Sequence, residues 1–245
     1  MDQTAGGPAF AIVIPANNEG ANIAPLLAEI EAAVGGGRAF ELIFVDDGST
    51  DDTHSILKQL AASRPWLRQV RHAKACGKAA ALRSGVRAAR AQSIVMLDGD
   101  GQNDPKYIPA MLAALEQGGE RVGLVNSVRI GRKDTEFKRI QSRIANRIRG
   151  ALLKDGTRDS VSGLKAFRRD VFLSMPFFDG LHRFMPALAR REGLELVQVD
   201  VVDRPRLHGK THYGMWNRLW VGILDLAGVW WLIRRKKHSP EIIKD

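Results

Sequence analysis

The stretch Ser93-Ile94-Val95-Met96-Leu97-Asp98-Gly99-Asp100-Gly101-Gln102 decides the fold class of this 245-residue chain. Its apolar run has the length of a buried strand, and two carboxylates follow directly. Alternate residues of an extended segment point to the same side, so we expect Asp98 and Asp100 to point toward one spot beyond the strand. Two hard oxygen ligands at such a spot suit Mg²⁺ or Mn²⁺. A solvated acidic turn after a strand is the alternative interpretation.

Strands and helices alternate along the first half of the chain. Strands are predicted at 10–14, 41–45, 66–71, 94–97 and 122–128, and helices at 22–34, 53–63, 77–90 and 105–116. This alternation predicts an α/β domain with a mostly parallel sheet and helices on both faces. Polar loops follow the strands, so we expect them at one edge of the sheet, where open α/β sheets bind ligands.

Beyond residue 128 the pattern changes. Segment 134–153 alternates apolar and basic residues with helical spacing, which is typical of an amphipathic helix on the protein core or on an anionic membrane surface. A polar turn at 159–163, an apolar segment at 164–167, a helix at 182–191 and a strand at 194–201 are predicted next. The chain therefore continues as a folded domain to about residue 214.

The C-terminal segment 215–245 is predicted to associate with membranes. Residues 215–233 are apolar and rich in tryptophan, a residue that favours the membrane–water boundary, and a basic cluster, 234–237, follows. The segment is too short, and too interrupted by Asp225, to span a bilayer. A helix packed on the core or at a dimer contact is the alternative, so oligomerisation stays open.

The net charge of +10 predicts an anionic partner: nucleic acid, an anionic membrane surface or a phosphorylated substrate. Carboxylates at three strand ends would repel a nucleic-acid backbone, and no nucleic-acid-binding signature is present, so we expect no nucleic-acid partner. The single cysteine, Cys76, excludes an internal disulfide and fits a reducing compartment. We find no signal-peptide pattern, no P-loop and no dinucleotide-binding glycine motif.

Taken together, the motifs resemble those of family 2 glycosyltransferases, which have the GT-A fold. The resemblance rests on Pro15-Ala-Asn-Asn18-Glu19, Asp46-Asp47-Gly-Ser-Thr-Asp51 and Asp98-Gly-Asp100-Gly-Gln102. Asp159-x-x-Ser162-Gly163 and Arg204-x-x-x-x-Gly209-x-Thr211-x-Tyr213 are similar to the branch that glycosylates polyprenyl phosphates, which includes dolichol-phosphate mannose synthases. The resemblance covers about residues 10–213. Thr211 and His212 depart from the Ser-Lys pair that is more frequent in this branch.

This resemblance implies an inverting, metal-dependent transfer from a nucleotide-sugar donor to polyprenyl phosphate, at the cytoplasmic face of the plasma membrane. It assigns the metal, Mg²⁺ or Mn²⁺, to Asp98, Asp100 and Gln102. It assigns donor binding to Pro15, Asn18, Glu19, Asp46, Asp47, Lys78, Asp98 and Gly99. The candidates for the lipid phosphate are Arg129, Arg143, Ser162, Arg204 and Lys210. Asp98, Asp100 and Arg204 are the candidate catalytic residues.

The nature of the acceptor decides whether a general base is needed. A lipid monophosphate has a second pKa of about 6, so at neutral pH it is largely a dianion and can attack without a base. A hydroxyl acceptor on a polysaccharide or glycolipid needs a base to remove its proton, and Asp159 is the obvious candidate. Both acceptors stay open at this point, as do the sugar and the nucleotide.

Overall fold

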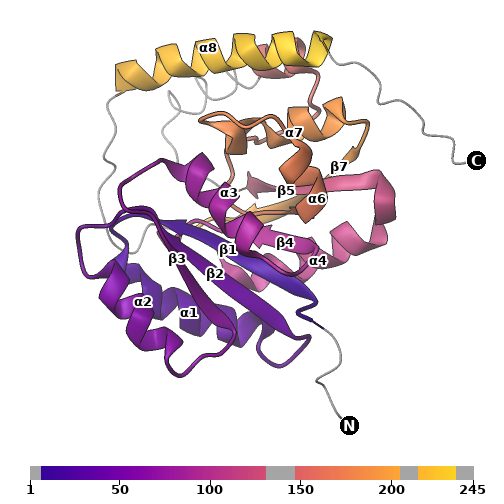
Figure 1. Ribbon diagram of the computed structural model, residues 1–245. Helices are drawn as coiled ribbons and strands as arrows, with labels where there is room; N and C mark the ends of the chain where they lie inside the picture. Colours follow the sequence, from indigo (N-terminus) through magenta and orange to yellow (C-terminus); the bar gives the residue numbers. More distant parts are fainter. Residues whose placement is uncertain (1–6, 131–146, 205–214, 236–245) are drawn as a thin grey trace, which may run out of the picture.

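The computed structural model describes residues 7–130, 147–204 and 215–235, and for 215–220 only the backbone (Figure 1). Seven strands form one sheet in the order β3-β2-β1-β4-β6-β5-β7. The strands are β1 (Phe10–Ala16), β2 (Phe40–Asp46), β3 (Leu67–Arg71), β4 (Ser93–Met96), β5 (Val122–Ile130), β6 (Lys165–Arg168) and β7 (Glu195–Val202). Strand β6 runs antiparallel to β4 and β5, whereas the other pairs are parallel. The predicted α/β class is therefore confirmed, with a mixed sheet.

Helices cover both faces of this sheet (Figure 1). They are α1 (Gly20–Val34), α2 (Thr53–Ala61), α3 (Lys78–Ala88), α4 (Ile108–Gln117), α6 (Arg169–Ser174), α7 (Leu181–Arg191) and α8 (Met215–Arg234). Short 3-10 turns lie at Pro105–Tyr107 and Gly119–Arg121. Alternation along β1 separates two cores, because Ile12 and Ile14 pack with α1 and α4 while Ala11 and Val13 pack with α3 and α7. The sheet is thus buried on both faces, as its apolar strands predict.

The end of one strand and the presence of one short helix differ from the sequence predictions. Strand β1 does not end at Ile14 but continues through Pro15, which pairs in register with Val45 of β2. Helix α6 was not predicted, because its six residues are too few to show a helical period.

Only residues 147–153 of the predicted helix at 134–153 lie in the described part of the chain, and they are helical. Their exposure contradicts one of the two expected orientations, an apolar stripe packed on the core. Ile148 and Leu152, members of that stripe, are 52% and 43% exposed, whereas Arg149 is buried. Arg149 is buried because Asp155 and the carbonyl of Thr157 accept its hydrogen bonds, at 2.9 and 3.0 Å. A buried arginine requires such partners, which the spacing of apolar residues cannot predict.

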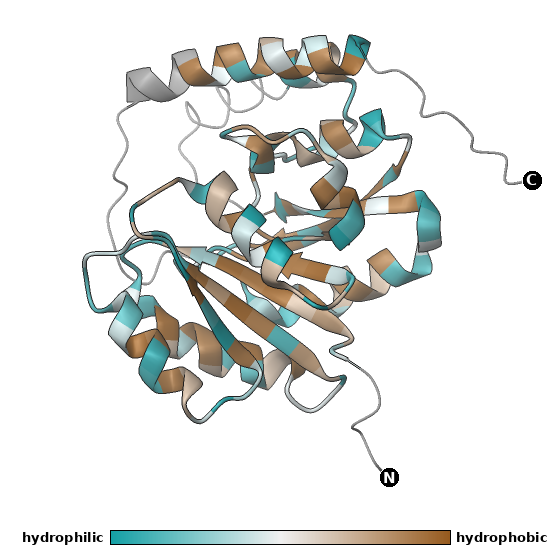
Figure 2. Cartoon of the chain, viewed as in Figure 1, coloured by the Kyte–Doolittle hydropathy of each residue, from teal (hydrophilic) through white to brown (hydrophobic). Residues whose placement is uncertain are grey.

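Helix α8 lies along the outside of the molecule, above α7 in Figure 1. Val229 is buried in the core that contains α7, and Leu226, Trp230 and Ile233 pack against it. Other apolar residues of α8 are exposed, Leu224 to 70% and Trp231 to 54%. Apolar residues recur along the helix (Figure 2). No helix in the described ranges is long and apolar enough to cross a membrane.

Candidate functional site

The predicted site residues gather at one edge of the sheet. Strands β1, β2, β4, β5 and β7 are parallel, so their carboxyl ends meet there, and the antiparallel β6 begins there. Across this edge, the loops after β1 and β2 form one half, and the start of β6 with the ends of β5 and β7 forms the other. Asp98, just after β4, stands between the two halves.

The loops after β1 and β2 are tied to each other by side chains. Asn18, whose φ of 58° lies in the left-handed region, accepts hydrogen bonds from the backbone N–H groups of Thr50 (2.8 Å) and Asp51 (3.2 Å). Asp51 in turn accepts from the N–H of Gly20. Burial raises the pKa of Asp51, but hydrogen bonds from Thr53 and from backbone groups outweigh it and leave the pKa below its usual value. Asn18 therefore links the two loops that form this half of the site.

The other residues of the β1 loop lie close to the β4 turn. Glu19 accepts a hydrogen bond from the side chain of Asn22 at 2.6 Å, and its own N–H donates to Thr53. The carbonyl of Pro15 lies beside Gly99, where an added Cβ would come within 3.3 Å of it. The two loops are thus in contact, as expected for residues that surround one ligand.

Asp46 ends β2, Asp47 follows it, and both are buried. Asp46 accepts from the N–H of Ser49 at 2.9 Å and pairs with Arg71. The carboxylate of Asp47 accepts from the N–H groups of Cys76 and Gly77, both at 2.8 Å, and lies 2.7 Å from the His72 ring. Asp47 thereby holds the loop that leads into α3.

Asp47, His72 and Cys76 also form a group whose possible ligand atoms all lie within 4.8 Å of one another. His72 additionally contacts the hydroxyl of Ser84 through Nε2, at 2.9 Å. These contacts indicate that the three residues lie close together because they hold the loop before α3 in place.

Asp98 is positioned from three sides. Its carboxylate forms an ion pair with Lys78 in the first turn of α3, and its N–H donates to Asn103 at 3.2 Å. Gly163 lies against it, because a Cβ there would sit 2.4 Å from Oδ2 of Asp98. Burial raises the pKa of Asp98, but the charge and hydrogen bond of Lys78 outweigh it and keep the pKa below its usual value. The carboxylate is therefore charged at neutral pH.

Asp100 and Gln102 follow in the same turn. Asp100 is buried, and its carboxylate accepts from the N–H of Gln102 at 3.1 Å. The carbonyl of Gln102 accepts from the N–H of Arg204 at 3.0 Å. Two carboxylates and an amide therefore share one turn, and their oxygens are the donor type that Mg²⁺ and Mn²⁺ prefer.

The predicted acceptor cations are engaged with carboxylates. Arg129, at the end of β5, binds Asp159 with two hydrogen bonds of 2.6 and 3.0 Å and lies 3.7 Å from Asp203. Arg204 binds Glu29 of α1 in the same two-pronged way, at 2.9 and 2.6 Å. Arg143 and Lys210 lie outside the described residues.

Asp159 and Ser162, in the turn before β6, are held inside the protein. Burial raises the pKa of Asp159, but Arg129 outweighs it and keeps the pKa below its usual value. The hydroxyl of Ser162 is buried against that of Ser127. Asp159 is therefore an ion-paired carboxylate, and Ser162 is part of the packing beneath the edge.

Two further residues lie near Asp98: Lys165, which sequence reasoning missed, and His182, which it interpreted only as a loop or phosphate-contact residue. Lys165 begins β6 and is 1% exposed, with its ammonium donating to the carbonyl of Ser162. His182 lies in the first turn of α7, and its Nδ1 is buried without a hydrogen-bond partner among the described residues. The Ser162-Gly163-Leu-Lys165 motif contained the signal for the lysine, but its burial depends on β6 lying between β4 and β5.

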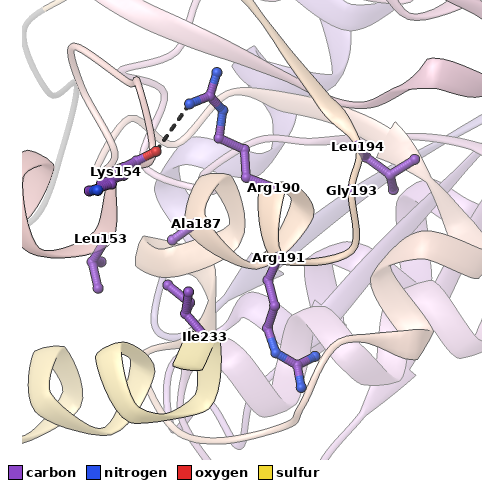
Figure 3. A pocket seen from close by; sticks show the side chains of 8 residues that line it. All are labelled: Leu153, Lys154, Ala187, Arg190, Arg191, Gly193, Leu194 and Ile233. Carbon is purple, nitrogen blue, oxygen red and sulfur yellow. Dashed lines mark hydrogen bonds between the residues drawn. The ribbon is translucent and has the colours of Figure 1, made fainter. Parts of the chain in front are cut away.

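A separate pocket lies at the other end of α7 (Figure 3). It is lined by Leu153, Lys154, Ala187, Arg190, Arg191, Gly193, Leu194 and Ile233. Arg190 donates to the carbonyl of Lys154 at 3.0 Å across it. None of the predicted site residues lines this pocket, so it is distinct from the edge that holds Asp98.

Comparison with known proteins places these features in context. Residues 11–174 match the model of glycosyl transferase family 2. The chain is 34% identical to dodecaprenyl-phosphate galacturonate synthase of Rhizobium johnstonii, over 93% of this chain and 68% of that protein. It is 32% identical to undecaprenyl-phosphate 4-deoxy-4-formamido-L-arabinose transferase of Edwardsiella ictaluri, over 83% of this chain and 62% of that protein.

Solved structures are also similar. Glucosyl-3-phosphoglycerate synthase from Mycobacterium tuberculosis, in complex with Mn²⁺, UDP and phosphoglyceric acid, superposes with a TM-score of 0.70 at 25% identity. The superposition covers 95% of this chain and 81% of that one.

Proposed function

This chain belongs to glycosyl transferase family 2, and we propose that it transfers a sugar from a nucleotide-sugar donor to polyprenyl phosphate. The observation that carries this proposal is the acceptor half of the site. There, Asp159 is bound by Arg129 through two hydrogen bonds. Two relatives whose names specify a polyprenyl-phosphate substrate or product support the same acceptor. The chain spans about two thirds of the first relative and about three fifths of the second.

The donor half suits a nucleotide sugar. We propose that the loops after β1 and β2 surround the nucleoside, with Pro15, Asn18, Glu19, Asp46 and Asp47 as predicted. Lys78 and Gly99 then lie where the diphosphate meets Asp98. The Mn²⁺ and UDP in the similar solved structure support this arrangement.

We further propose that Asp98, Asp100 and Gln102 hold a divalent cation, Mg²⁺ or Mn²⁺. The fit rests on the donor set, since carboxylate and amide oxygens share one turn and Asp98 is kept ionised by Lys78. When bound, such an ion neutralises negative charge on the departing nucleotide phosphate. Gly163 allows the carboxylate of Asp98 to occupy this position, because a larger residue would displace it.

The acceptor half argues against a hydroxyl acceptor. A general base must take up a proton, but Arg129 keeps the pKa of Asp159 below its usual value and occupies both of its oxygens. A phosphate acceptor needs no base, because it already carries negative charge at neutral pH. Its attack opposite the leaving nucleotide inverts the anomeric centre.

We propose that the enzyme works at the cytoplasmic face of the plasma membrane, bound peripherally through the segment 215–245. The exposed apolar side chains of Leu224 and Trp231 on α8 support this assignment. Helix α8 also packs on the catalytic domain through Val229, so a membrane-bound α8 would hold the domain close to the lipid surface.

A transfer assay with matched acceptors tests the function. The full chain is incubated with Mn²⁺, labelled UDP- and GDP-sugars, and vesicles containing either undecaprenyl phosphate or undecaprenol. We expect labelled lipid from the phosphate with at least one donor and none from the alcohol, which differs only in lacking the phosphate. Transfer to undecaprenol or to a glycolipid hydroxyl would contradict the proposal, as would complete dependence on Asp159 as a proton acceptor.

A further inference from the structure

We propose that Lys165 and His182 form the seat of the acceptor phosphate, with Lys165 as its counterion and His182 as a hydrogen-bond donor. This inference rests on the proposed function and names the residues that would recognise its acceptor. It differs from the sequence prediction, which gave that role to Arg129, Arg143, Ser162, Arg204 and Lys210.

Lys165 is a buried cation next to the reacting centre. Its Cα is paired with that of Met96, two residues before Asp98, and Gly163 of the same turn touches the Asp98 carboxylate. Among the described residues, the Lys165 ammonium makes a hydrogen bond only to a backbone carbonyl, that of Ser162, and no ion pair. A buried ammonium without an ion-paired carboxylate destabilises the folded protein, and a bound anionic ligand would offset this destabilisation.

Burial and, second, the nearby charge of Lys78 lower the pKa of Lys165 to about 7. Both effects disfavour the charged form in the protein without ligand. A bound anion stabilises that form, so phosphate and the lysine proton favour each other. The carboxylates of Asp159 and Asp98 act to raise the pKa of Lys165 without restoring its usual value, and neither forms an ion pair with the ammonium in the described part of the chain.

His182 supplies a directional partner from a second element, α7. It lies in the first turn of α7, an eleven-residue helix whose N-terminal end carries partial positive charge. Burial and, second, Lys78 hold its pKa well below its usual value, so the ring is neutral at pH 7. The buried Nδ1 has no partner among the described residues. Phosphate oxygens only accept, so an Nδ1–H would donate to one of them.

The order of the strands indicates which phosphate binds there. The loops of β1 and β2 lie on one side of Asp98, and β6 lies on the other. A donor that occupies the β1 and β2 loops reaches Asp98 with its diphosphate, so β6 lies on the side that is left for the acceptor.

The arginines predicted for this role are less suited to it. Arg129 and Arg204 are each bound by a carboxylate through two hydrogen bonds, with Asp159 and Glu29 respectively. A phosphate would have to displace these carboxylates to gain the same contacts. Lys165 and His182 have no such competitor among the residues that the structure describes.

Binding and kinetics of matched variants test this seat. Farnesyl phosphate, farnesol and inorganic phosphate are titrated calorimetrically into the full chain and into Lys165→Met. We expect farnesyl phosphate to bind the wild type and to bind Lys165→Met about tenfold or more weakly, as for a lost charge-assisted hydrogen bond. UDP affinity with Mn²⁺ should change less than twofold. Lys58→Met, at an exposed lysine of α2, is the control and should bind as the wild type.

Two further readouts separate binding from a structural role. Lys165→Met should raise the melting temperature, because a buried unpaired charge is removed, whereas loss of a structural lysine would lower it. His182→Asn keeps a donor near the Nδ1 position and should retain most of the acceptor affinity, whereas His182→Leu should raise the acceptor KM with little change in the donor KM.

The outcomes distinguish this inference from the proposed function. Unchanged farnesyl phosphate binding by Lys165→Met, or no binding by the wild type, overturns the seat even if the enzyme glycosylates undecaprenyl phosphate. Binding that depends on Lys165, in a chain that transfers no sugar from any donor, supports the seat and counts against the proposed function. Equal affinity for inorganic and farnesyl phosphate would identify a free-phosphate site and overturn the lipid assignment.

Discussion

Replacing Gly163 by alanine should reduce transfer about 100-fold while leaving a folded protein. The added Cβ would lie 2.4 Å from Oδ2 of Asp98 and 2.5 Å from Oδ1 of Asn103, whereas ordinary contacts begin at 3.4 Å. The Asp98 carboxylate must therefore move by about 1 Å, a displacement that typically costs about 100-fold in rate. Overpacking of this kind costs about 1–3 kcal/mol of stability.

Gly85→Ala is a matched control for this effect. Its Cβ would lie 2.4 Å from Val13 and 2.9 Å from Val45, between α3 and the sheet, so it strains the core by a similar overlap away from Asp98. Gly36→Ala, where no atom lies within 4 Å, controls for the substitution itself.

The assay compares initial transfer rates with melting temperatures, at a temperature well below the melting point of every variant. We expect Gly163→Ala and Gly85→Ala to lose similar stability, but only Gly163→Ala to lose activity. The reasoning is refuted if Gly163→Ala transfers sugar at the wild-type rate, or if Gly85→Ala loses as much activity.

Three other predictions follow from the site and from α8. Asp100→Asn should abolish transfer and the rise in melting temperature that Mn²⁺ with UDP gives the wild type; an unchanged rise would contradict the metal assignment. The pKa of the Asp159 carboxyl is lower in the folded protein than its unfolded value of about 3.9. The carboxylate therefore stabilises the fold above about pH 3.9, and this stabilisation is lost as the pH falls through the folded-state pKa. Thermal unfolding of Asp159→Asn should therefore depend less on pH between about 5 and 3 than that of the wild type; equal slopes would refute this. The double variant Leu224→Glu/Trp231→Glu should bind anionic vesicles in a flotation assay more weakly than Lys58→Glu, a variant with the same change in net charge. Equal vesicle binding by these two variants would exclude α8 as the anchor.

The position of the site could be predicted because it follows from local pattern. Short apolar runs ending in Asn, Asp and Gly identify strands and their ends, and parallel strands bring those ends to one edge. Asp98 and Asp100 could be selected in this way because they directly follow an apolar run. Strand β4 ends at Met96, however, so both lie in the turn beyond the strand whose alternation suggested a common direction.

The partners of the site residues could not be predicted, because they depend on contacts distant in sequence. Asp47 is bound by the N–H groups of Cys76 and Gly77, and Arg204 by Glu29 of α1. Lys165 has the spacing of an ordinary strand lysine, and only the insertion of β6 between β4 and β5 buries it. Local sequence therefore located the candidate site, but it did not determine which residues bind one another there.

The hydrogen bonds that join the β1 and β2 loops have a calorimetric consequence. Asn18 and Asp51 hold these loops together without a ligand, so the proposed binding of a nucleotide would need to order little of either loop. Ordering a free side chain typically costs about 0.5–1.5 kcal/mol of entropy, and such preorganisation removes much of that cost. Nucleotide binding should thus carry a small entropic penalty. Asn18→Ala should bind nucleotide more weakly, chiefly because the entropy of binding becomes less favourable while the enthalpy changes little.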